Sequence, residues 1–346
     1  MRLPAEWEPQ SCIWLSWPSL SSSIPSPTHP TPSHWQHLAP SAIAQQWARL
    51  AATISLSQIV AVNAPALWHD HIRASVQSAG GNLSRLHLYP HETNDVWCRD
   101  HGAIFIQEQG QVIATDWQFN GWGGNFAPWD LDNTVAQAMA TAQGLPCRSY
   151  PEVLEGGAIE SNGAGTLLTT RAVLLNPNRN PHLDQPGVEQ MLASRLGINH
   201  VVWLEDGIVG DDTGGHIDDI ARYVATDTIV ISTDPAGPNQ HLLQRNQDLL
   251  RAQSDAQIIE LPMPQSCELP GWRLPTLPAS YVNFLITNEL VLVPTFRQAR
   301  NDQYALDLMS DLFPQREVIG IDALDIVSEG GALHCISMQQ PALSEH

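Results

Sequence analysis

The sequence predicts an α/β protein built from five repeated units, each combining strands with a helix, that pack around a common axis. Three observations lead to this prediction: a glycine-containing motif recurs along the chain, an apolar run follows most copies, and amphipathic helical segments lie between them. The chain has 346 residues, of which 43% are hydrophobic and 15% charged, as in folded globular proteins. We therefore expect one domain that covers residues 1–346.

The repeated motif is clearest in "VLEGGAIE" (153–160) and "VSEGGALH" (327–334). Two weaker copies are "CRDHGAIF" (98–105) and "DDTGGHID" (211–218). Aligning the copies on their last glycine gives separations of 55, 58 and 116 residues, the last being twice 58, between Gly102, Gly157, Gly215 and Gly331. A fifth copy is therefore expected near residue 273, close to "PASYVNFLI" (278–286), and the units number five.

The elements between the motifs follow from periodicity. "SCIWLSWP" (11–18) predicts a strand, and the proline- and serine-rich segment 18–35 predicts an irregular loop that is either a lid or an insertion. The apolar spacing of "SAIAQQWARLAATIS" (41–55), "GVEQMLASRLG" (187–197) and "HLLQRNQDLLRAQ" (241–253) predicts helices. Each unit thus mixes strand and helix.

Composition restricts the partners. The formal net charge of −20 disfavours nucleic acid and favours a cationic substrate, although such charge also keeps a protein in solution. No run of apolar residues could span a bilayer, and no apolar segment with a cleavage site follows the start, so we expect no membrane partner. The five scattered cysteines include no C-x-x-C pair, which argues against a disulfide framework and favours a cytoplasmic location.

If five units pack around an axis, their equivalent loops meet at its centre. That arrangement would gather Asp100, Glu155, His216, Asp218 and Cys335. In an extended segment His216 and Asp218 would share a face. A cysteine is most often an inert core residue, but a nearby imidazole can activate Cys335 as a nucleophile. Carboxylates raise the pKa of a thiol, so their presence predicts a cationic substrate such as a guanidinium, which two carboxylates can hold.

The motifs "AEWEPQSCIWLSWP", "DVWCRDHGAIF", "FNGWGG", "EGGAIESNGAGTLLTT", "NRNP", "GDDTGGHIDDIAR", "ASYVNF" and "EGGALHCISMQQP" together resemble the agmatine deiminases, within the bacterial peptidylarginine deiminase group of the guanidine-modifying superfamily. They extend from residue 5 to residue 341. The resemblance implies a five-bladed α/β propeller with no metal or cofactor. It implies that Cys335 is the nucleophile, His216 the general acid/base, and Asp100 and Asp218 the guanidinium clamps. It also implies substrate contacts by Trp97, Glu155, Asp211 and Asn283.

The implied reaction is hydrolysis of a small cationic guanidino compound, agmatine, to N-carbamoylputrescine and ammonia through a covalent thiouronium adduct. Free, peptidyl or methylated arginine is the alternative substrate, because His101, Ala103 and Glu160 depart from residues frequent in the family. A homo-oligomer is compatible with the resemblance.

Four other interpretations stay open at this stage. His216, Asp218, Asp211 and His334 could bind a metal, or the chain could bind polyamines without catalysis. Cys98, next to Arg99, is the rival nucleophile. Glu155 and Glu329 could instead brace their glycine turns.

Overall fold

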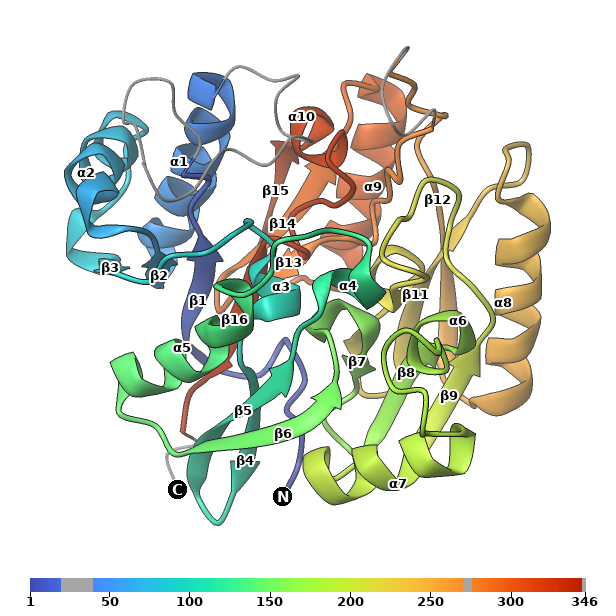
Figure 1. The fold of residues 1–346 in the computed structure, drawn as a ribbon. Helices are drawn as coiled ribbons and strands as arrows, with labels where there is room; N and C mark the ends of the chain where they lie inside the picture. Colours follow the sequence, from blue (N-terminus) through green and yellow to red (C-terminus); the bar gives the residue numbers. More distant parts are fainter. Residues whose placement is uncertain (20–39, 270–275, 344–346) are drawn as a thin grey trace.

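The computed structural model describes residues 1–19, 40–269 and 276–343, which form a mixed α/β fold with five separate sheets (Figure 1). The segment 18–35, predicted to be a lid or an insertion, lies almost wholly outside the described residues, and so does residue 273. Within the described part of the chain, no helix is both long and apolar enough to cross a membrane.

One sheet illustrates the unit that repeats. Strand β4 (Ile104–Glu108) runs antiparallel to β5 (Gln111–Gln118). The chain then passes through helix α5 (Val135–Gln143) and returns as β6 (Cys147–Val153), parallel to β5. Each unit therefore contains an antiparallel pair followed by a helical crossover to a parallel strand.

Three more sheets repeat this strand order. One contains β7 (Glu160–Ser161), β8 (Thr166–Thr170) and β9 (His200–Leu204), with α6 (Arg171–Leu174) and α7 (Gln185–Leu196) before β9. The next contains β10 (Ala221–Ala225), β11 (Thr228–Thr233) and β12 (Gln257–Pro262), with α8 (Gln240–Gln253) as the crossover. The third contains β13 (Leu285–Ile286), β14 (Leu290–Thr295) and β15 (Glu317–Asp322), with α9 (Ala299–Leu312).

The fifth sheet combines both ends of the described chain. Strand β16 (Ser337–Pro341) pairs antiparallel with β1 (Gln10–Ser16), and in this pairing Met338 lies opposite Trp14. Helix α1 (Pro40–Ser57) leads to β2 (Ile59–Asn63), and α2 (His69–Ser78) leads to β3 (Leu86–Tyr89); both strands run parallel to β1.

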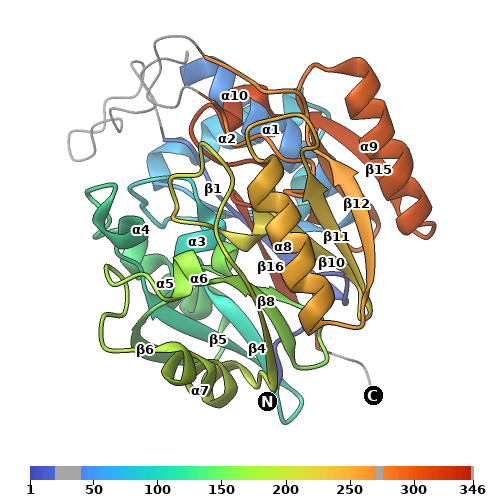
Figure 2. The same ribbon diagram turned by 90° about the vertical axis from the view of Figure 1, so that its right-hand side faces the viewer.

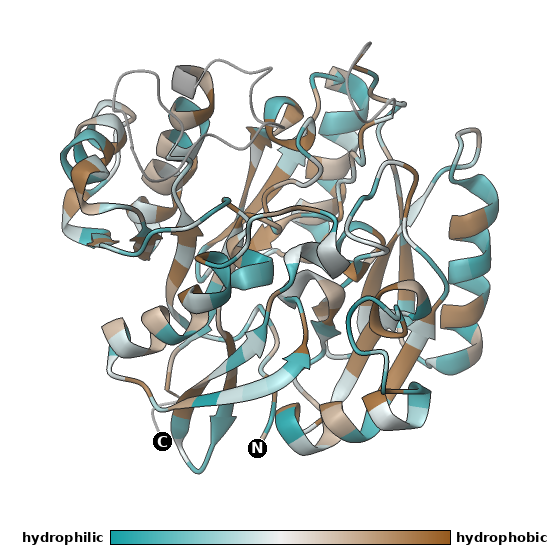
Figure 3. Ribbon diagram, in the orientation of Figure 1, coloured by the Kyte–Doolittle hydropathy of each residue, from teal (hydrophilic) through white to brown (hydrophobic). Residues whose placement is uncertain are grey.

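The crossover helices lie toward the outside of the molecule, as α5, α7 and α8 do in Figures 1 and 2. Helix α7 begins where the side chain of Asp184 accepts a hydrogen bond from the backbone of Gly187, and ends at Gly197, whose positive φ suits a helix terminus. In α8 the buried residues are Leu243, Asn246, Gln247 and Leu250, and the helix alternates in hydropathy along its length (Figure 3). The predicted helices at 41–55, 187–197 and 241–253 and the strand at 11–18 are confirmed.

Short helical turns precede the first strands: α3 (Cys98–His101) before β4, a 3-10 turn (Gly156–Ala158) before β7, and another (Ile217–Asp219) before β10. The remaining short elements are α4 (Gly121–Gly124), α10 (Leu324–Val327) and 3-10 turns at Ala66–Trp68, Leu83–Arg85 and Asp132–Thr134. The aligned glycines lie at different distances from the strands that follow them. β4 begins two residues after Gly102 and β7 three residues after Gly157, whereas β10 and β16 each begin six residues after Gly215 and Gly331. The four copies are therefore not all in register.

Candidate active site

The predicted site residues lie on the short turns that precede the first strands of successive sheets. Asp100 belongs to α3, ahead of β4, and Glu155 stands directly before the turn that leads to β7. His216 and Asp218 belong to the turn before β10, and Cys335 lies two residues ahead of β16. Because these turns contact one another, side chains that are far apart in the sequence meet at one place.

A pocket of about 340 Å³ borders these turns. Its lining combines aromatic rings, carboxylates, glycines and the thiol: Trp97, Asp100, Trp122, Phe126, Asp212, Thr213, Glu329, Gly330, Gly331 and Cys335. Tryptophan faces and carboxylates attract cations, so the pocket suits a flat positively charged group. His216 and Asp218 are not part of this lining and are completely buried.

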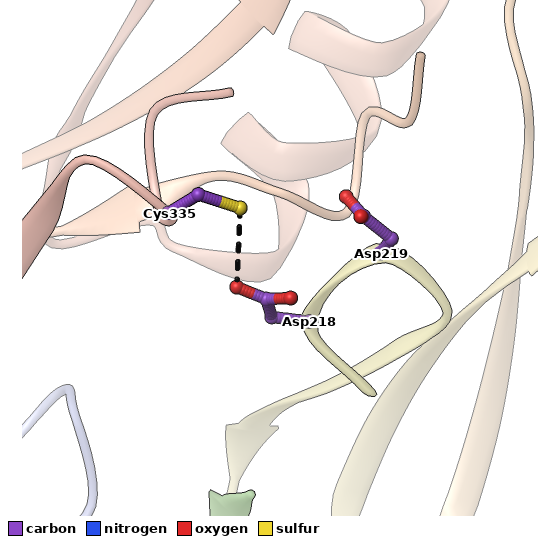
Figure 4. Close-up of side chains that lie close together, drawn as sticks. All are labelled: Asp218, Asp219 and Cys335. Atoms are coloured by element: carbon purple, nitrogen blue, oxygen red, sulfur yellow. Dashed lines mark hydrogen bonds between the residues drawn. The ribbon is translucent and has the colours of Figure 1, made fainter. Parts of the chain in front are cut away.

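The thiol of Cys335 lies among acids. Its Sγ is 3.5 Å from Oδ2 of Asp218 (Figure 4). The amide nitrogen of Asn283 lies 3.0 Å from the same Sγ. Burial raises the pKa of Cys335 well above its usual value, and the charges of Asp218, Asp219 and then Asp100 raise it further. The thiol is therefore protonated at neutral pH until a positive charge arrives.

The ring of His216 lies between two carboxylates. Its Nδ1 is 3.7 Å from Oδ1 of Asp100, and its Nε2 is 3.7 Å from Oε2 of Glu155. Burial disfavours the charged ring, but Asp100, Glu155 and Asp218 outweigh burial and raise the pKa of His216 to about 10. Burial raises the pKa of Asp100 to about 6. At neutral pH the site thus holds an imidazolium, a proton donor, beside ionised Asp100.

Two of the predicted substrate contacts, Glu155 and Asp211, lie next to His216 rather than on the pocket wall. Glu155, fully buried, accepts hydrogen bonds of 2.8 and 2.9 Å from Nε of Arg179. Asp211 accepts from the backbone N–H groups of Gly215 and His216 at 2.8 and 3.1 Å, so it braces the turn that carries the histidine. Neither acid lines the pocket.

The other two predicted contacts are closer to the pocket. Trp97 forms part of its wall. Asn283 donates to Sγ of Cys335 and, at 3.0 Å, to Oδ1 of Asp219, while its own oxygen accepts from the backbone of His334 at 2.9 Å. Asn283 thereby fixes the thiol relative to the turn before β10.

The predicted extended conformation of "HIDD" is wrong. Ile217–Asp219 forms a 3-10 turn, so His216 and Asp218 are not alternate residues of a strand. His216 faces Asp100 and Glu155, whereas Asp218 contacts His334 and Cys335. The glycines just before this segment favour a turn over an extended strand.

Sequence reasoning gave no role to three residues that hold the site together. Trp122, in "FNGWGG", donates from Nε1 to Oδ2 of Asp100 at 3.0 Å. Arg179, in "NRNP", pairs with Glu155. The backbone of Arg99 donates to the carbonyl of Cys335 at 3.1 Å and links α3 to the turn before β16. The motifs contain these residues, but their partners could not be read from the sequence.

Residues 2–341 match the model of the Porphyromonas-type peptidyl-arginine deiminase family. The chain belongs to this family. A relative from Legionella pneumophila (strain Paris) is 36% identical over 347 residues, covering 98% of this chain and 95% of its own. The agmatine deiminase of Pseudomonas fluorescens (strain SBW25) is 33% identical over 369 residues, with 98% and 95% covered.

Solved structures of the family have the same mixed α/β fold. An agmatine deiminase of Enterococcus faecalis, described as catalysing its reaction, is similar with a TM-score of 0.87 and 29% identity, covering 98% of this chain and 95% of that one. A cysteine-to-serine variant of a C. jejuni agmatine deiminase with substrate bound has a TM-score of 0.86 and 29% identity, covering 99% and 96%.

The positions where this member departs from residues frequent in the family lie outside the pocket lining. Glu160 pairs with Arg222 at 2.7 Å. His101 is buried against Ser16 at 2.8 Å, and burial lowers the pKa of His101 to about 3. Ala103 is completely buried. None of the three side chains therefore lines the pocket that contains Cys335.

The geometry gives little support to the metal site or to Cys98 as the nucleophile, two of the alternatives that the sequence left open. Of the proposed metal ligands, His334 is occupied by Asp218, and Asp211 by backbone N–H groups. Among the described residues, the cluster with ligand atoms close enough for a metal is Asp218, Asp219 and Cys335 (Figure 4). Cys98, the rival nucleophile, does not line the pocket, and its burial outweighs Arg99 and raises its pKa to about 12.

Proposed function

We propose that this protein is an agmatine deiminase that hydrolyses the guanidinium of agmatine to N-carbamoylputrescine and ammonia. The observation that carries the proposal is the meeting of a cysteine thiol, a histidine held as imidazolium and buried carboxylates beside an aromatic pocket. Membership of the deiminase family supports it, and agmatine deiminases among the relatives favour this substrate.

Asp100 and Asp218 clamp the guanidinium. Oδ1 of Asp218 has no hydrogen-bond partner in the described part of the chain, although the residue is fully buried. A buried carboxylate oxygen left unpaired is costly, and a guanidinium N–H satisfies it. The cation passes between Asp100 and Cys335 to reach this oxygen. Trp97 and Trp122 form the walls against which its plane packs.

Cys335 performs the covalent chemistry. The arriving cation favours the thiolate, because it offsets the acids that raise the pKa of the thiol. The thiol proton is released to water, and the thiolate attacks the central carbon to form a C–S bond while Asp218 stays ionised. His216 donates its proton to the departing nitrogen, and ammonia leaves. A cationic thiouronium adduct remains on Cys335.

Water completes the reaction. Neutral His216 takes a proton from a water molecule as its oxygen attacks the adduct carbon. The C–S bond breaks, the thiolate of Cys335 recovers a proton, and the ureido product leaves. Glu155, paired with Arg179, and Asp211 act through His216 by holding its ring and its backbone. These steps use no metal or cofactor.

We also propose that the five sheets are the blades of a single α/β propeller domain spanning residues 1–346. The repeated strand order and the meeting of the first-strand turns support this arrangement. A cytoplasmic location and assembly into a homo-oligomer belong to the same proposal, and burial of four of the five free cysteines is consistent with a reducing compartment.

The test is ammonia release from a panel of guanidino compounds: agmatine, free arginine, an arginine-containing peptide and methylated arginine. Agmatine should give the highest kcat/KM, with activity unchanged after exhaustive chelation and absent in Cys335→Ala. The description of the family as peptidyl-arginine deiminases favours the peptide as the second candidate. A higher kcat/KM for any of the arginine compounds would replace agmatine as the substrate.

A further inference from the structure

A chain of buried hydrogen bonds connects the N-terminal segment to Asp218. Oε2 of Glu6 lies 2.8 Å from Nε2 of His334, and Nδ1 of His334 lies 2.7 Å from Oδ2 of Asp218. That same oxygen is 3.5 Å from Sγ of Cys335. None of the four side chains is more than 4% exposed. The steps described above use Asp218 and Cys335 but give no task to Glu6 or His334.

The partners of His334 determine its charge. Both ring nitrogens face carboxylate oxygens, and an ionised carboxylate only accepts hydrogen bonds. Both nitrogens must therefore donate, which only the imidazolium can do. Glu6 is ionised as well, because it also accepts from Nη2 of Arg222 and from the backbone of Ile286, each at 2.7 Å.

We propose that Glu6 and His334 are positioning residues that hold Asp218 with Oδ2 engaged and Oδ1 left for the substrate. The inference rests on the clamp role proposed for Asp218. His334 fixes one carboxylate oxygen, so the rotation of the group is set, and Oδ1 is the oxygen without a partner in the described residues. Glu6 fixes the far side of the imidazole and prevents its rotation.

His334 also keeps Asp218 ionised among other acids. Burial raises the pKa of Asp218, but the hydrogen bond and charge of His334, with His216 and Arg222, outweigh burial and lower it. Without this imidazolium, Asp218 would lose the strongest of the three influences that lower its pKa and keep only the charges of His216 and Arg222. Its pKa would then rise, and a protonated Asp218 is a poor partner for a guanidinium.

Two substitutions of His334 distinguish the contribution of Nδ1, which contacts Asp218, from that of Nε2, which contacts Glu6. The amide nitrogen of His334→Asn can take the place of Nδ1 and still donate to Asp218, whereas that of His334→Gln reaches toward Glu6 instead. Both remove the charge, so KM for agmatine should rise at least about tenfold in each. The rise in His334→Asn should be at least about threefold smaller than in His334→Gln, because one hydrogen bond remains.

The division between KM and kcat distinguishes positioning from folding. A lost clamp contact weakens substrate binding and raises KM, whereas a partly unfolded enzyme has lower apparent kcat and unchanged KM. Glu6→Gln should raise KM less than His334→Gln does. Glu8→Gln is the matched control, since Glu8 lies in the same segment and pairs only with the partly exposed Arg2 among described basic side chains; it should keep wild-type KM.

A readout without turnover keeps this inference separate from the proposed function. Binding of agmatine to Cys335→Ser, which lacks the thiol, is measured by isothermal titration calorimetry, and its Kd should rise at least about tenfold when His334→Gln is added, because the carboxylate of Asp218 is no longer held. Absence of turnover in the wild type, with this loss of affinity intact, would refute the function and leave the positioning. A wild-type KM for agmatine in His334→Gln would refute the positioning. So would a rise in KM that is smaller in His334→Gln than in His334→Asn. If the His334 variants do not fold, Glu6→Gln decides by the same KM criterion.

Discussion

Gly157 lies against the side chains of His216 and Asp100, the proposed acid/base and clamp, and filling that position with a methyl group tests the geometry of the site. A Cβ at Gly157 would lie 2.5 Å from Nδ1 of His216 and 2.8 Å from Oδ1 of Asp100. Ordinary contacts between carbon and other heavy atoms are about 3.5 Å or longer. In Gly157→Ala the imidazole must therefore retreat by about 1 Å, or the backbone of residue 157 must move and weaken its 3.1 Å hydrogen bond to Asp100.

A displacement of about 1 Å at a reacting group can lower the rate about a hundredfold, which corresponds to about 2.7 kcal/mol in the barrier. We expect kcat/KM of Gly157→Ala for agmatine to fall by about that factor, while overpacking costs about 1–3 kcal/mol of the free energy of unfolding. Steady-state kinetics and thermal melting would measure the two effects.

The matched control is Gly187→Ala in α7, where an added Cβ would lie 3.2 Å from Oδ1 of Asp184, so that side chain needs to shift by only a few tenths of an ångström. Alanine favours a helix by about 1 kcal/mol over glycine, which offsets this close contact, so the variant should melt near the wild-type temperature and keep full activity. A folded Gly157→Ala enzyme with activity within about threefold of wild type would show that His216 and Asp100 do not act from the positions described.

Three further predictions concern charge and nucleophile. Asp100→Asn and Asp218→Asn should each lose at least about tenfold in kcat/KM for agmatine, since a charged hydrogen bond contributes about 1.5–3 kcal/mol; near wild-type kinetics would contradict the clamp assignment. Cys98→Ala should keep most activity and Cys335→Ala none, and rapid acid quenching of the turning-over wild type should show, by intact mass and peptide mapping, an adduct on Cys335; the opposite pattern would move the chemistry to Cys98. The raised pKa of Asp100, about 6, means that its carboxylate is lost as pH falls through that value, and the raised pKa of His216, about 10, means that its donating proton is lost as pH rises through that value. The rate profile should therefore decline on both sides of this range, and a single decline near pH 7 would contradict the assignment.

The sequence predicted which side chains meet better than it predicted the local backbone. The glycine motif located four of the turns, and the reason is steric: Gly157 lies against His216 and Asp100, and a Cβ at Gly331 would lie 2.6 Å from the ring of Trp97 and 2.9 Å from Cβ of Cys335. Functional side chains approach these positions so closely that only glycine fits. A motif that recurs for this reason marks the centre of the site directly.

The rest could not be predicted because it depends on partners distant in the sequence. Glu155 was predicted to contact the substrate, but in the structure Nε of Arg179 donates to both of its carboxylate oxygens. Glu160, which departs from the family, pairs with Arg222, a contact between two different sheets. The alignment did not predict that β10 and β16 begin six residues after their glycines whereas β4 begins two residues after Gly102, because the length of the intervening turn does not follow from a short repeated motif.

The pairing of β16 with β1 has a consequence for the order in which the enzyme becomes active. Proteins are synthesised from the N-terminus, and folding begins on the residues already made. β1 is made early, but its antiparallel partner comes more than 300 residues later, so this contact closes late and contributes to slow folding. Cys335 stands just ahead of β16 and is the last of the proposed catalytic residues to be made. Until Cys335 has been added, the growing chain lacks its proposed nucleophile and cannot form the proposed covalent adduct. The late strand β16 completes the fifth sheet and brings this cysteine into place at the same time.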